Sequence, residues 1–353
     1  MRRVGRPYNV LMLSDRFRFA YRILRCFDAA GAKVHVLGGK DSGGLRFSKF
    51  CASFRQRVND YHGDLRPLIE EVNSIITQLN IDLIISGEHF VMRPLIAMAP
   101  KLNAPCFPMP TSEQFDLLNN KWRFTQLCVS LGIRCPRSQL VANISDLRCA
   151  VKSGKFSIPF VSKPLDFDGS RGVLPILRAV DLHNLDSIQY SPLLVQEFIQ
   201  GADVAASVYC DHGRIKAFIA HRLKRATYFT FESDQIRADI EKIVFATKAH
   251  GIMNFDLRIG PDGSMYWLEC NPRFFFWIHM SLLAGVPFVE FGLPNWNVSG
   301  SSTSPTGTNV RFFKAAAIEL ARPWRLTKRD FGYLRFVLAD PIPWLRETLG
   351  YEI

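Results

Sequence analysis

Short apolar runs alternate with helical patterns over the first 110 residues, and this alternation limits the fold more than any other feature of the sequence. The apolar runs predict buried strands at 9–13, 34–38, 82–86 and 106–109. Apolar residues recur at helical spacing over 16–30, 65–80 and 92–102. Strands that alternate with helices usually pair in parallel, so we expect an α/β layer. No GxGxxG pattern follows the first strand, which argues against a dinucleotide-binding fold.

The pattern changes from about residue 111 onward. Helical segments are predicted at 112–118, 121–131 and 233–250, with short strands and two more helices between the last two. Two strands at 252–259 and 264–270 flank Gly260-Pro261-Asp262-Gly263, a strong turn signal, and predict an antiparallel hairpin. Residues 295–309 are polar and rich in Gly, Pro and Ser, which predicts a loop. The whole chain therefore combines α/β and α+β parts.

The composition is that of a folded globular chain. With 353 residues, 48% hydrophobic and 22% charged, it is long enough for two or three folding units. Its eight cysteines form no CxxC pair or Cys/His cluster, which argues against a zinc site. The first residues hold only a four-residue apolar run, too short for a signal peptide, so we expect a cytoplasmic protein with reduced thiols. Residues 274–293 are largely apolar, but His279, Pro287 and Glu290 favour a buried loop and helix beside an active site over a membrane span.

The net charge of +12 is concentrated near the start of the chain. Residues 1–60 hold thirteen Lys/Arg and four Asp/Glu, a net charge of +9. On the helix predicted at 16–30, Arg18, Arg22 and Arg25 lie opposite the apolar stripe. The simplest interpretation is a solvated basic face. The alternative is a site for an acidic substrate, an anionic membrane surface or an acidic partner. Nucleic acid is not expected, because no nucleic-acid-binding motif accompanies the charge.

The predicted hairpin places two carboxylates on one face. If Pro261 and Asp262 are the central turn residues, Asp256 lies opposite Trp267 and diagonal to Glu269. Asn271 and Arg273 continue along the same face, since strand residues two apart point the same way. Two acidic groups on one face repel unless a cation lies between them, and such an all-oxygen set suits Mg²⁺. An ordinary solvent-facing hairpin is the alternative.

Two further segments have features of a nucleotide site. An apolar strand, 160–164, presents Lys163 and is followed by a loop with Gly169 and Gly172, where backbone N–H groups would approach phosphate oxygens. Residues 193–203 form a strand, a short linker and the acid Asp203, which would suit a base and ribose hydroxyls. Each segment alone is explained equally well by an ordinary hairpin.

Taken in this order, the three segments resemble the ATP-grasp superfamily over about residues 8–293. Members have an α/β amino-terminal domain, a small lid and a carboxy-terminal domain with an antiparallel sheet, and they bind ATP between the last two. The resemblance implies phosphate contacts from Lys121, Lys163, Gly169, Ser170, Gly172 and Arg222. It implies adenine and ribose contacts from Gln196, Glu197, Ile199 and Asp203. The implied ligands for Mg²⁺, or for Mn²⁺ in its place, are Asp256, Glu269 and Asn271.

The same resemblance implies domain limits and a reaction. It divides the chain into a pre-ATP-grasp domain (1–110), an ATP-grasp domain (111–310, lid about 135–195) and an extension packed on the latter (311–353). The implied enzyme is a ligase that activates a carboxylate with Mg·ATP as an acyl phosphate and joins it to an amine. Lys163, Arg222 and Arg273 would act on the transferred phosphoryl group. A homodimer is implied only at the family level.

Some residues depart from the family pattern and leave alternatives open. Gln196 and Asp203 stand where glutamate is common. Residues 274–277 (FFFW) stand where relatives often have small residues. These rings either narrow the acceptor pocket or make it apolar, or they only pack the core. The Glu-x-Asn-Pro-Arg segment, 269–273, also resembles the carbamoyl-phosphate synthetase and biotin carboxylase branch, which leaves bicarbonate activation open. A non-catalytic ATP-binding regulatory protein is the other alternative. An anionic group near Ser14-Asp15-Arg16 would meet Arg16 and the free N–H groups of the next helix.

Overall fold

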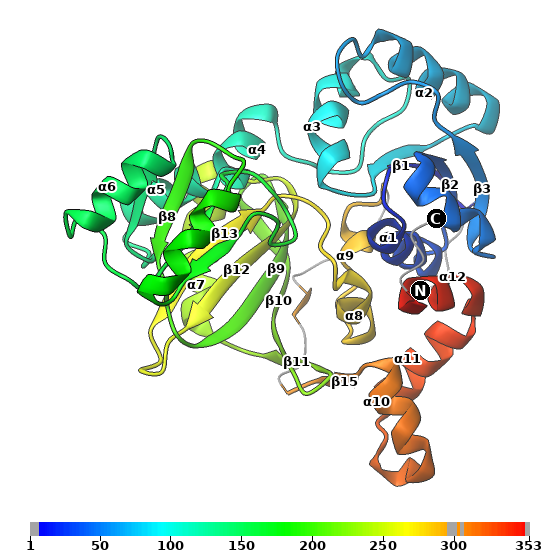
Figure 1. Ribbon diagram of the computed structural model, residues 1–353. Helices are drawn as coiled ribbons and strands as arrows, with labels where there is room; N and C mark the ends of the chain where they lie inside the picture. Colours follow the sequence, from blue (N-terminus) through cyan, green and yellow to red (C-terminus); the bar gives the residue numbers. More distant parts are fainter. Residues whose placement is uncertain (1–6, 295–301, 304–306, 350–353) are drawn as a thin grey trace.

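Three sheets organise the part of the chain that the structure describes. This computed structural model describes residues 7–294, 302–303 and 307–349, so most of the loop predicted at 295–309 lies outside the described residues. Figure 1 shows the first sheet and its helices on one side of the molecule and the strands of the larger sheet on the other. The helices α8 (Ile278–Leu283) and α9 (Phe288–Phe291) lie between them.

The first sheet confirms the expected parallel α/β layer. Its strand order is β3-β2-β1-β4, and all pairs are parallel. The strands are β1 (Asn9–Ser14), β2 (Lys33–Gly38), β3 (Cys51–Gln56) and β4 (Leu83–Ser86). The accompanying helices are α1 (Phe17–Ala29), α2 (Arg66–Leu79), α3 (His89–Met98), and the short 3-10 helices η1 (Lys40–Phe47) and η2 (Ala99–Lys101).

Two details of this sheet differ from the sequence-based prediction. Strand β3 was not predicted, because it is a half-exposed edge strand without a continuous apolar run. The strand predicted at 106–109 is reduced to a single bridge between Ile84 and Cys106. Prolines at 105, 108 and 110 remove the backbone donors that a longer ladder would need.

The second sheet is small and antiparallel, and its order is β5-β8-β6-β7. It consists of β5 (Ser138–Val141), β6 (Phe160–Lys163), β7 (Leu174–Ile176) and β8 (Leu193–Glu197), with α6 (Ile144–Lys152) and η3 (Ala179–Ser187). Phe160, Leu193 and Val195 are fully buried in its own apolar core. We call this unit, residues 138–197, the lid sheet.

The third sheet is the largest, and its order is β13-β12-β9-β10-β11-β15. It contains β9 (Ala202–Asp211), β10 (Arg214–Lys224), β11 (Thr227–Phe231), β12 (Gly251–Ile259), β13 (Met265–Asn271) and β15 (Asn309–Arg311), and β14 (Ser302–Thr303) pairs with β10. One face is covered by α4 (Ser112–Asn119), α5 (Lys121–Ser130) and α7 (Asp234–Thr247). The predicted antiparallel hairpin is β12–β13.

The first and third sheets share one apolar core. Phe27 of α1, Phe107 and Phe274 form a cluster of rings with centroids 5.1–6.0 Å apart. The apolar stretch 274–293 forms the loop and short helices at this junction, as its polar residues predicted. Within the described residues no helix is both long and apolar enough for a membrane crossing.

Of the three arginines predicted on a solvated basic face, Arg18 is exposed, Arg22 is covered by the loop after β13 and Arg25 is covered by the C-terminal helices. These helices are α10 (Phe313–Ile318), the 3-10 turns η4 (Glu319–Ala321) and η5 (Pro323–Arg325), α11 (Lys328–Leu338) and α12 (Pro341–Leu349), and they run back to α1 (Figure 1). Arg22 and Arg25 are only 8% and 4% exposed. Arg22 stacks on the ring of Phe276, and Arg25 donates to the Phe336 carbonyl at 2.7 Å. The sequence predicted a stripe opposite the core, but not that other parts of the chain would cover it.

Candidate active site

A cleft of about 1340 Å³ lies between the lid sheet and the large sheet and reaches the start of α1. Ligand pockets usually measure roughly 300–1,000 Å³, so the cleft has room for a nucleotide and a second substrate. Of the site residues predicted from the sequence, all except Gly172 line this cleft. Six strands, the start of α5 and three loops bring them together.

The two predicted metal-binding carboxylates are directly opposite each other at the centre of the cleft. Asp256 of β12 pairs with Glu269 of β13, so the predicted pairing of Asp256 with Trp267 was wrong. Two causes shift the register: the loop spans 260–264, and Leu268 is an extra residue that bulges from β13. The bulge turns a diagonal relation into a direct one and increases the repulsion between the carboxylates.

Amide and ammonium groups surround this carboxylate pair. The Asn271 Nδ2 atom donates to Asp256 and to Glu269, both at 3.2 Å. Asn254 donates to the other oxygen of Asp256 at 3.1 Å. The Lys121 Nζ atom lies 3.1 Å from Glu269 and donates to the Phe167 carbonyl at 2.7 Å. The pair is therefore partly neutralised by the protein itself.

Lys121 is held in position by its helix. Asn120 caps α5 by accepting hydrogen bonds from the backbone N–H groups of Trp122 and Arg123, both at 3.1 Å. This cap fixes the first turn of α5, and the side chain of Lys121 at its first position is 4% exposed. The sequence signal for this arrangement is the Asn-Lys pair at 120–121.

Burial and neighbouring charges shift the pKa values of the two carboxylates in opposite directions. Burial, followed by the Glu269 charge, raises the pKa of Asp256 to about 7. Burial also acts on Glu269, but Lys121 and Lys163 outweigh it and lower the pKa of this carboxyl below its usual range. Without a further cation, the site holds one carboxylate and one group that readily takes a proton.

Predicted phosphate-binding residues line the same cleft as the carboxylate pair. Lys163 ends β6 and is 7% exposed, and burial lowers its pKa to about 8 against the opposing effect of Glu269. The loop after it turns through Gly169, Ser170 and Gly172, whose φ angles are +62°, +59° and +71°. Such left-handed backbone exposes N–H groups on a concave surface that suits oxyanions.

The predicted adenine linker leaves one buried polar atom without a partner. The Gln196 Nε2 atom donates to Ser138 at 2.9 Å, whereas the Oε1 atom has no hydrogen bond within the described residues. A ligand with an exocyclic amine, such as adenine, would satisfy it. Ile199 is buried beside it, and Glu197 is exposed at the end of β8.

Two predicted contacts are engaged differently than expected. Asp203, the expected ribose acid, accepts two hydrogen bonds from Arg258 at 2.6 and 2.8 Å, although its side chain is 77% exposed. Arg273 is 8% exposed and donates to Asn271 Oδ1 at 2.9 Å, and its Nε atom has no partner in the described part of the chain. Arg222 is exposed on β10 and faces the cleft.

Comparisons with known proteins agree with this architecture. Residues 189–316 match a family described as ATP-grasp in the biosynthetic pathway with Ter operon. The carbamoyl phosphate synthase large chain of Vibrio cholerae is 24% identical over 201 residues, which cover 50% of this chain but 18% of that protein. This chain therefore spans about a fifth of the length of its curated relatives.

Two solved structures extend the similarity over most of the chain. An L-amino acid ligase from Bacillus licheniformis superposes with a TM-score of 0.62 at 16% identity, covering 82% of this chain and 74% of that one. N5-carboxyaminoimidazole synthetase from Staphylococcus aureus, complexed with ADP, gives a TM-score of 0.66 at 14% identity, covering 86% and 82%. The chain has the ATP-grasp fold, and its residues 189–316 match an ATP-grasp family.

Two polar residues near the cleft, Glu88 and His89, were not predicted as site residues. Glu88 and His89 follow β4, and Glu88 accepts hydrogen bonds from the backbone N–H groups of Asp15 and Arg16. Glu88 thus occupies part of the position where an external anion was expected. Burial and the Arg273 charge lower the pKa of His89 to about 4. The only sequence signal was a Glu-His pair after a strand, which is common in ordinary folds.

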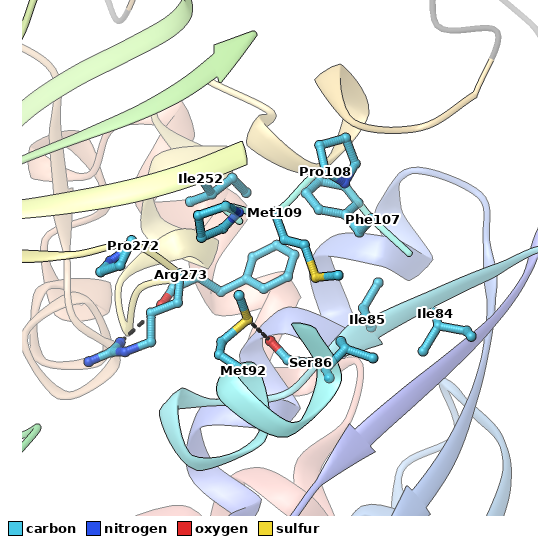
Figure 2. Close-up of a pocket in the computed structure, with 13 residues that line it drawn as sticks. Ile84, Ile85, Ser86, Met92, Phe107, Pro108, Met109, Ile252, Pro272 and Arg273 are labelled. Atoms are coloured by element: carbon cyan, nitrogen blue, oxygen red, sulfur yellow. Dashed lines mark hydrogen bonds between the residues drawn. The ribbon is translucent and has the colours of Figure 1, made fainter. Parts of the chain in front are cut away.

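A second, much smaller cavity lies between β4 and the β12–β13 hairpin (Figure 2). Its volume is about 20 Å³, and its lining is mostly apolar. This is room for about one water molecule, so it is a packing gap. Figure 2 shows the Arg273 guanidinium directed away from the cavity and donating to the Phe274 carbonyl at 3.0 Å.

One cluster of potential metal ligands lies elsewhere in the described part of the chain. The ligand atoms of Asp211, His212 and His250 lie within 4.8 Å of one another, at the β9–β10 turn and just before β12. No sequence pattern indicates this cluster, because the two histidines are 38 residues apart. The histidine rings stack with their centroids 4.1 Å apart. It is separate from the residues that line the cleft.

Proposed function

We propose that this protein is an ADP-forming ligase that activates a carboxylate with Mg·ATP and joins it to an amine. The observation that carries the proposal is the buried carboxylate pair Asp256–Glu269, with Lys121 and Lys163 beside it, at the centre of a cleft large enough for two substrates. The similarity to an L-amino acid ligase supports an amine as the acceptor. The activity of the longer carbamoyl phosphate synthases is not assigned to this protein, because the chain covers only a small part of their length.

The residues present fit a divalent cation. Asp256 and Glu269 are paired, largely buried carboxylates, and Asp256 tends to hold a proton because burial, followed by the Glu269 charge, raises its pKa. An oxygen-only set of this kind suits Mg²⁺ or Mn²⁺. Asn271 now presents its amide nitrogen to the carboxylates, so it would serve as a ligand only after its amide rotates. When bound, the ion would neutralise charge on the phosphate oxygens.

The protein's own contribution is positioning and charge neutralisation. Lys121 and Lys163 would hold the phosphates, and the Gln196 carbonyl would accept from the adenine amine. A carboxylate oxygen of the substrate attacks the γ-phosphorus, and the bond to the β-bridging oxygen breaks to release ADP. Arg222 and Arg273 would stabilise charge on the transferred group.

The second step needs no further cofactor. The amine nitrogen attacks the acyl carbon, inorganic phosphate leaves with the former carboxylate oxygen, and the nitrogen loses a proton. His221 is not a candidate base, since it is 2% exposed and stacked on Tyr228, and burial lowers its pKa to about 3. The proton therefore passes to solvent or to the released phosphate.

Thermal unfolding with and without Mg·ATP tests the nucleotide site. A ligand at 100 times its Kd stabilises the native state by about 2.7 kcal/mol, which we expect to appear as a higher midpoint for the wild type. Glu269→Ala should lose most of this shift. Glu241→Ala on the exposed face of α7 is the matched control and should keep it.

Catalysis is tested separately by ADP release. Hydroxylamine replaces the unknown amine and converts an acyl phosphate into a hydroxamate, so each candidate acid is assayed alone. Hydroxamate and ADP formed in equal amounts would support the ligase. A midpoint shift without ADP release from a broad panel of acids would contradict the ligase and favour a non-catalytic ATP-binding protein.

A further inference from the structure

One part of the cleft has an unusual lining. It is formed by three segments, 16–19 at the start of α1, 222–224 at the end of β10 and 273–277 after β13, which we call the acceptor wall. Its cleft-lining cations are Arg16, Arg18, Arg222, Lys224 and Arg273, and the three segments contain no acidic residue. Asp168 pairs with Arg16 at 3.1 Å, but the cations outnumber it, and this excess of positive charge favours an anionic substrate.

The same wall is rich in aromatic rings that lie outside the buried core. Phe274 and Phe275 are 5% and 3% exposed, as core residues are, whereas Phe19, Phe276 and Trp277 are only partly buried and line the cleft. The rings of Phe19 and Phe276 lie 6.2 Å apart, centroid to centroid. They come from α1 and from the loop after β13, so two distant parts of the chain build one apolar surface.

Contacts with other parts of the chain hold two of these rings, Phe276 and Trp277, in place. The Arg22 guanidinium lies 3.3 Å from the centroid of Phe276 and donates to the carbonyl of the same residue at 3.2 Å. Trp277 stacks on Phe312 with an angle of 8° between the rings. Rings held in this way lose little conformational freedom when a ligand binds, which favours affinity.

The cationic and aromatic parts of the wall are adjacent. The Arg273 guanidinium carbon lies 5.3 Å from the centroid of Phe19. A carboxylate bound at Arg273 therefore has an aromatic surface within the length of a short carbon chain. The Nε atom of Arg273 is a buried donor that has no hydrogen-bond partner within the described residues.

We propose that the acid activated by this protein carries an aromatic ring, with its carboxylate at Arg273 and its ring against Phe19 and Phe276. The inference rests on the proposed function and adds the class of substrate to it. A small acid such as bicarbonate would leave the aromatic part of the wall in contact with water. Stacked and edge-to-face aromatic contacts strengthen binding beyond the burial of apolar area.

Calorimetric titration of the full chain with Mg·ADP present tests this inference without catalysis. The probes are 3-phenylpropionate and propionate, which differ only in the ring. We expect the aromatic acid to bind at least tenfold more tightly. Equal affinities, or no binding of 3-phenylpropionate, would overturn the inference.

Two variants test whether this difference in affinity comes from the acceptor wall. Phe276→Ala should reduce the preference for 3-phenylpropionate at least fivefold and leave the midpoint shift with Mg·ATP unchanged, which also shows that the variant is folded. Phe245→Ala, an aromatic residue that is 78% exposed on α7, is the control and should change neither. A preference that survives Phe276→Ala unchanged contradicts the assignment.

The inference and the proposed function fail in different ways. If 3-phenylpropionate binds with the expected preference but gives no hydroxamate with ATP and hydroxylamine, the acceptor wall is correctly assigned and the ligase is not. If hydroxamates form equally well from propionate and 3-phenylpropionate, the ligase stands and the aromatic substrate class is wrong.

Discussion

Glu88 is a buried carboxylate that the proposed reaction does not use. It is 2% exposed, accepts hydrogen bonds from the backbone of Asp15 and Arg16, and lies 3.3 Å from the Ser14 hydroxyl. Burial outweighs these hydrogen bonds and raises its pKa to about 8. At neutral pH the folded protein therefore tends to hold a proton on Glu88 that the unfolded chain has lost.

This raised pKa predicts a pH-dependent stability. Between about pH 4.5 and 8 the unfolded state loses the Glu88 proton first, so the wild type loses stability as the pH rises, by up to about 1.4 kcal/mol per pH unit. Glu88→Gln is neutral at every pH and removes this contribution. Urea unfolding at pH 5, 6, 7 and 8 should show the stability of the variant rising relative to the wild type.

Using the difference between the two proteins cancels other titrating groups. The buried His221 and His279 have lowered pKa values and shift stability in the opposite direction, but they are present in both chains. A difference that stays constant from pH 5 to 8 would contradict the assigned pKa of Glu88.

At the residue scale, several residues that form an ordered pattern in the sequence also lie together in the structure. Lys121, Lys163 and Glu269 belong to such a series, and their roles stay a prediction. Glu88 and His89 lie near the same place, but their role depends on burial, which a single sequence does not show. The predicted pairing of Asp256 was wrong because the longer loop and the bulged residue Leu268 change the register, and no local signal announces such a bulge.

At the scale of elements, the loop 165–172 is attached to the first sheet's domain. Asp168 accepts from Arg16 at 3.1 Å and from Arg171 at 2.6 Å. Both guanidinium groups lie over the ring of Phe90, at 4.3 and 4.9 Å from its centroid. The loop that is expected to contact phosphate is therefore held by Arg16 at the start of α1 and by Phe90 of α3.

Neutralising Asp168 should release this loop. Asp168→Asn keeps the size of the side chain but removes the charge from both ion pairs, so we expect faster cleavage by trypsin after Arg171 in the absence of ligand. Limited proteolysis followed by mass spectrometry measures this rate. Asp186→Asn, which affects the exposed pair with Arg148 elsewhere in the lid sheet, should leave cleavage unchanged.

The result also distinguishes two roles for the loop. If Mg·ATP suppresses cleavage in Asp168→Asn to the wild-type rate, the nucleotide itself closes the loop. Equal cleavage rates in the absence of ligand would contradict a role for Asp168 in holding it.

Sequence reasoning identified most of the helices and strands of this chain but not how they cover each other. The helix at 16–30 was found at 17–29, and its apolar stripe does face the core. Its arginines were interpreted as solvated because their cover comes from residues 276 and 336, more than 250 positions later. Contacts of this sequence separation leave no periodic signal.

At the scale of the whole molecule, the C-terminal helices contact the first domain as well as the large sheet. Asp340, at the junction of α11 and α12, is 3% exposed and accepts from the Ser48 hydroxyl and the Lys49 backbone N–H. Its carbonyl accepts from Tyr21 of α1. The extension predicted to pack on the ATP-grasp domain thus also contacts α1 and the segment after η1. The domain limits themselves stay a prediction.

Removing the Asp340 carboxylate should destabilise the whole fold. Two buried donors would lose their partner in Asp340→Ala, at a cost of about 2 kcal/mol. We expect a lower urea midpoint with an unchanged slope. Asp262→Ala, in the exposed loop between β12 and β13, is a control that should cost less than about 1 kcal/mol. A loss of the same size in both variants would contradict the importance of the Asp340 contacts.

The cover over α1 also bears on how the chain is made. The helix α1 is synthesised before the carbonyls of residues 276 and 336, which accept from Arg22 and Arg25. Until those residues emerge, both guanidinium groups lack these partners and stay in water rather than being buried. The packing around α1 is therefore complete only after residue 336 has left the ribosome.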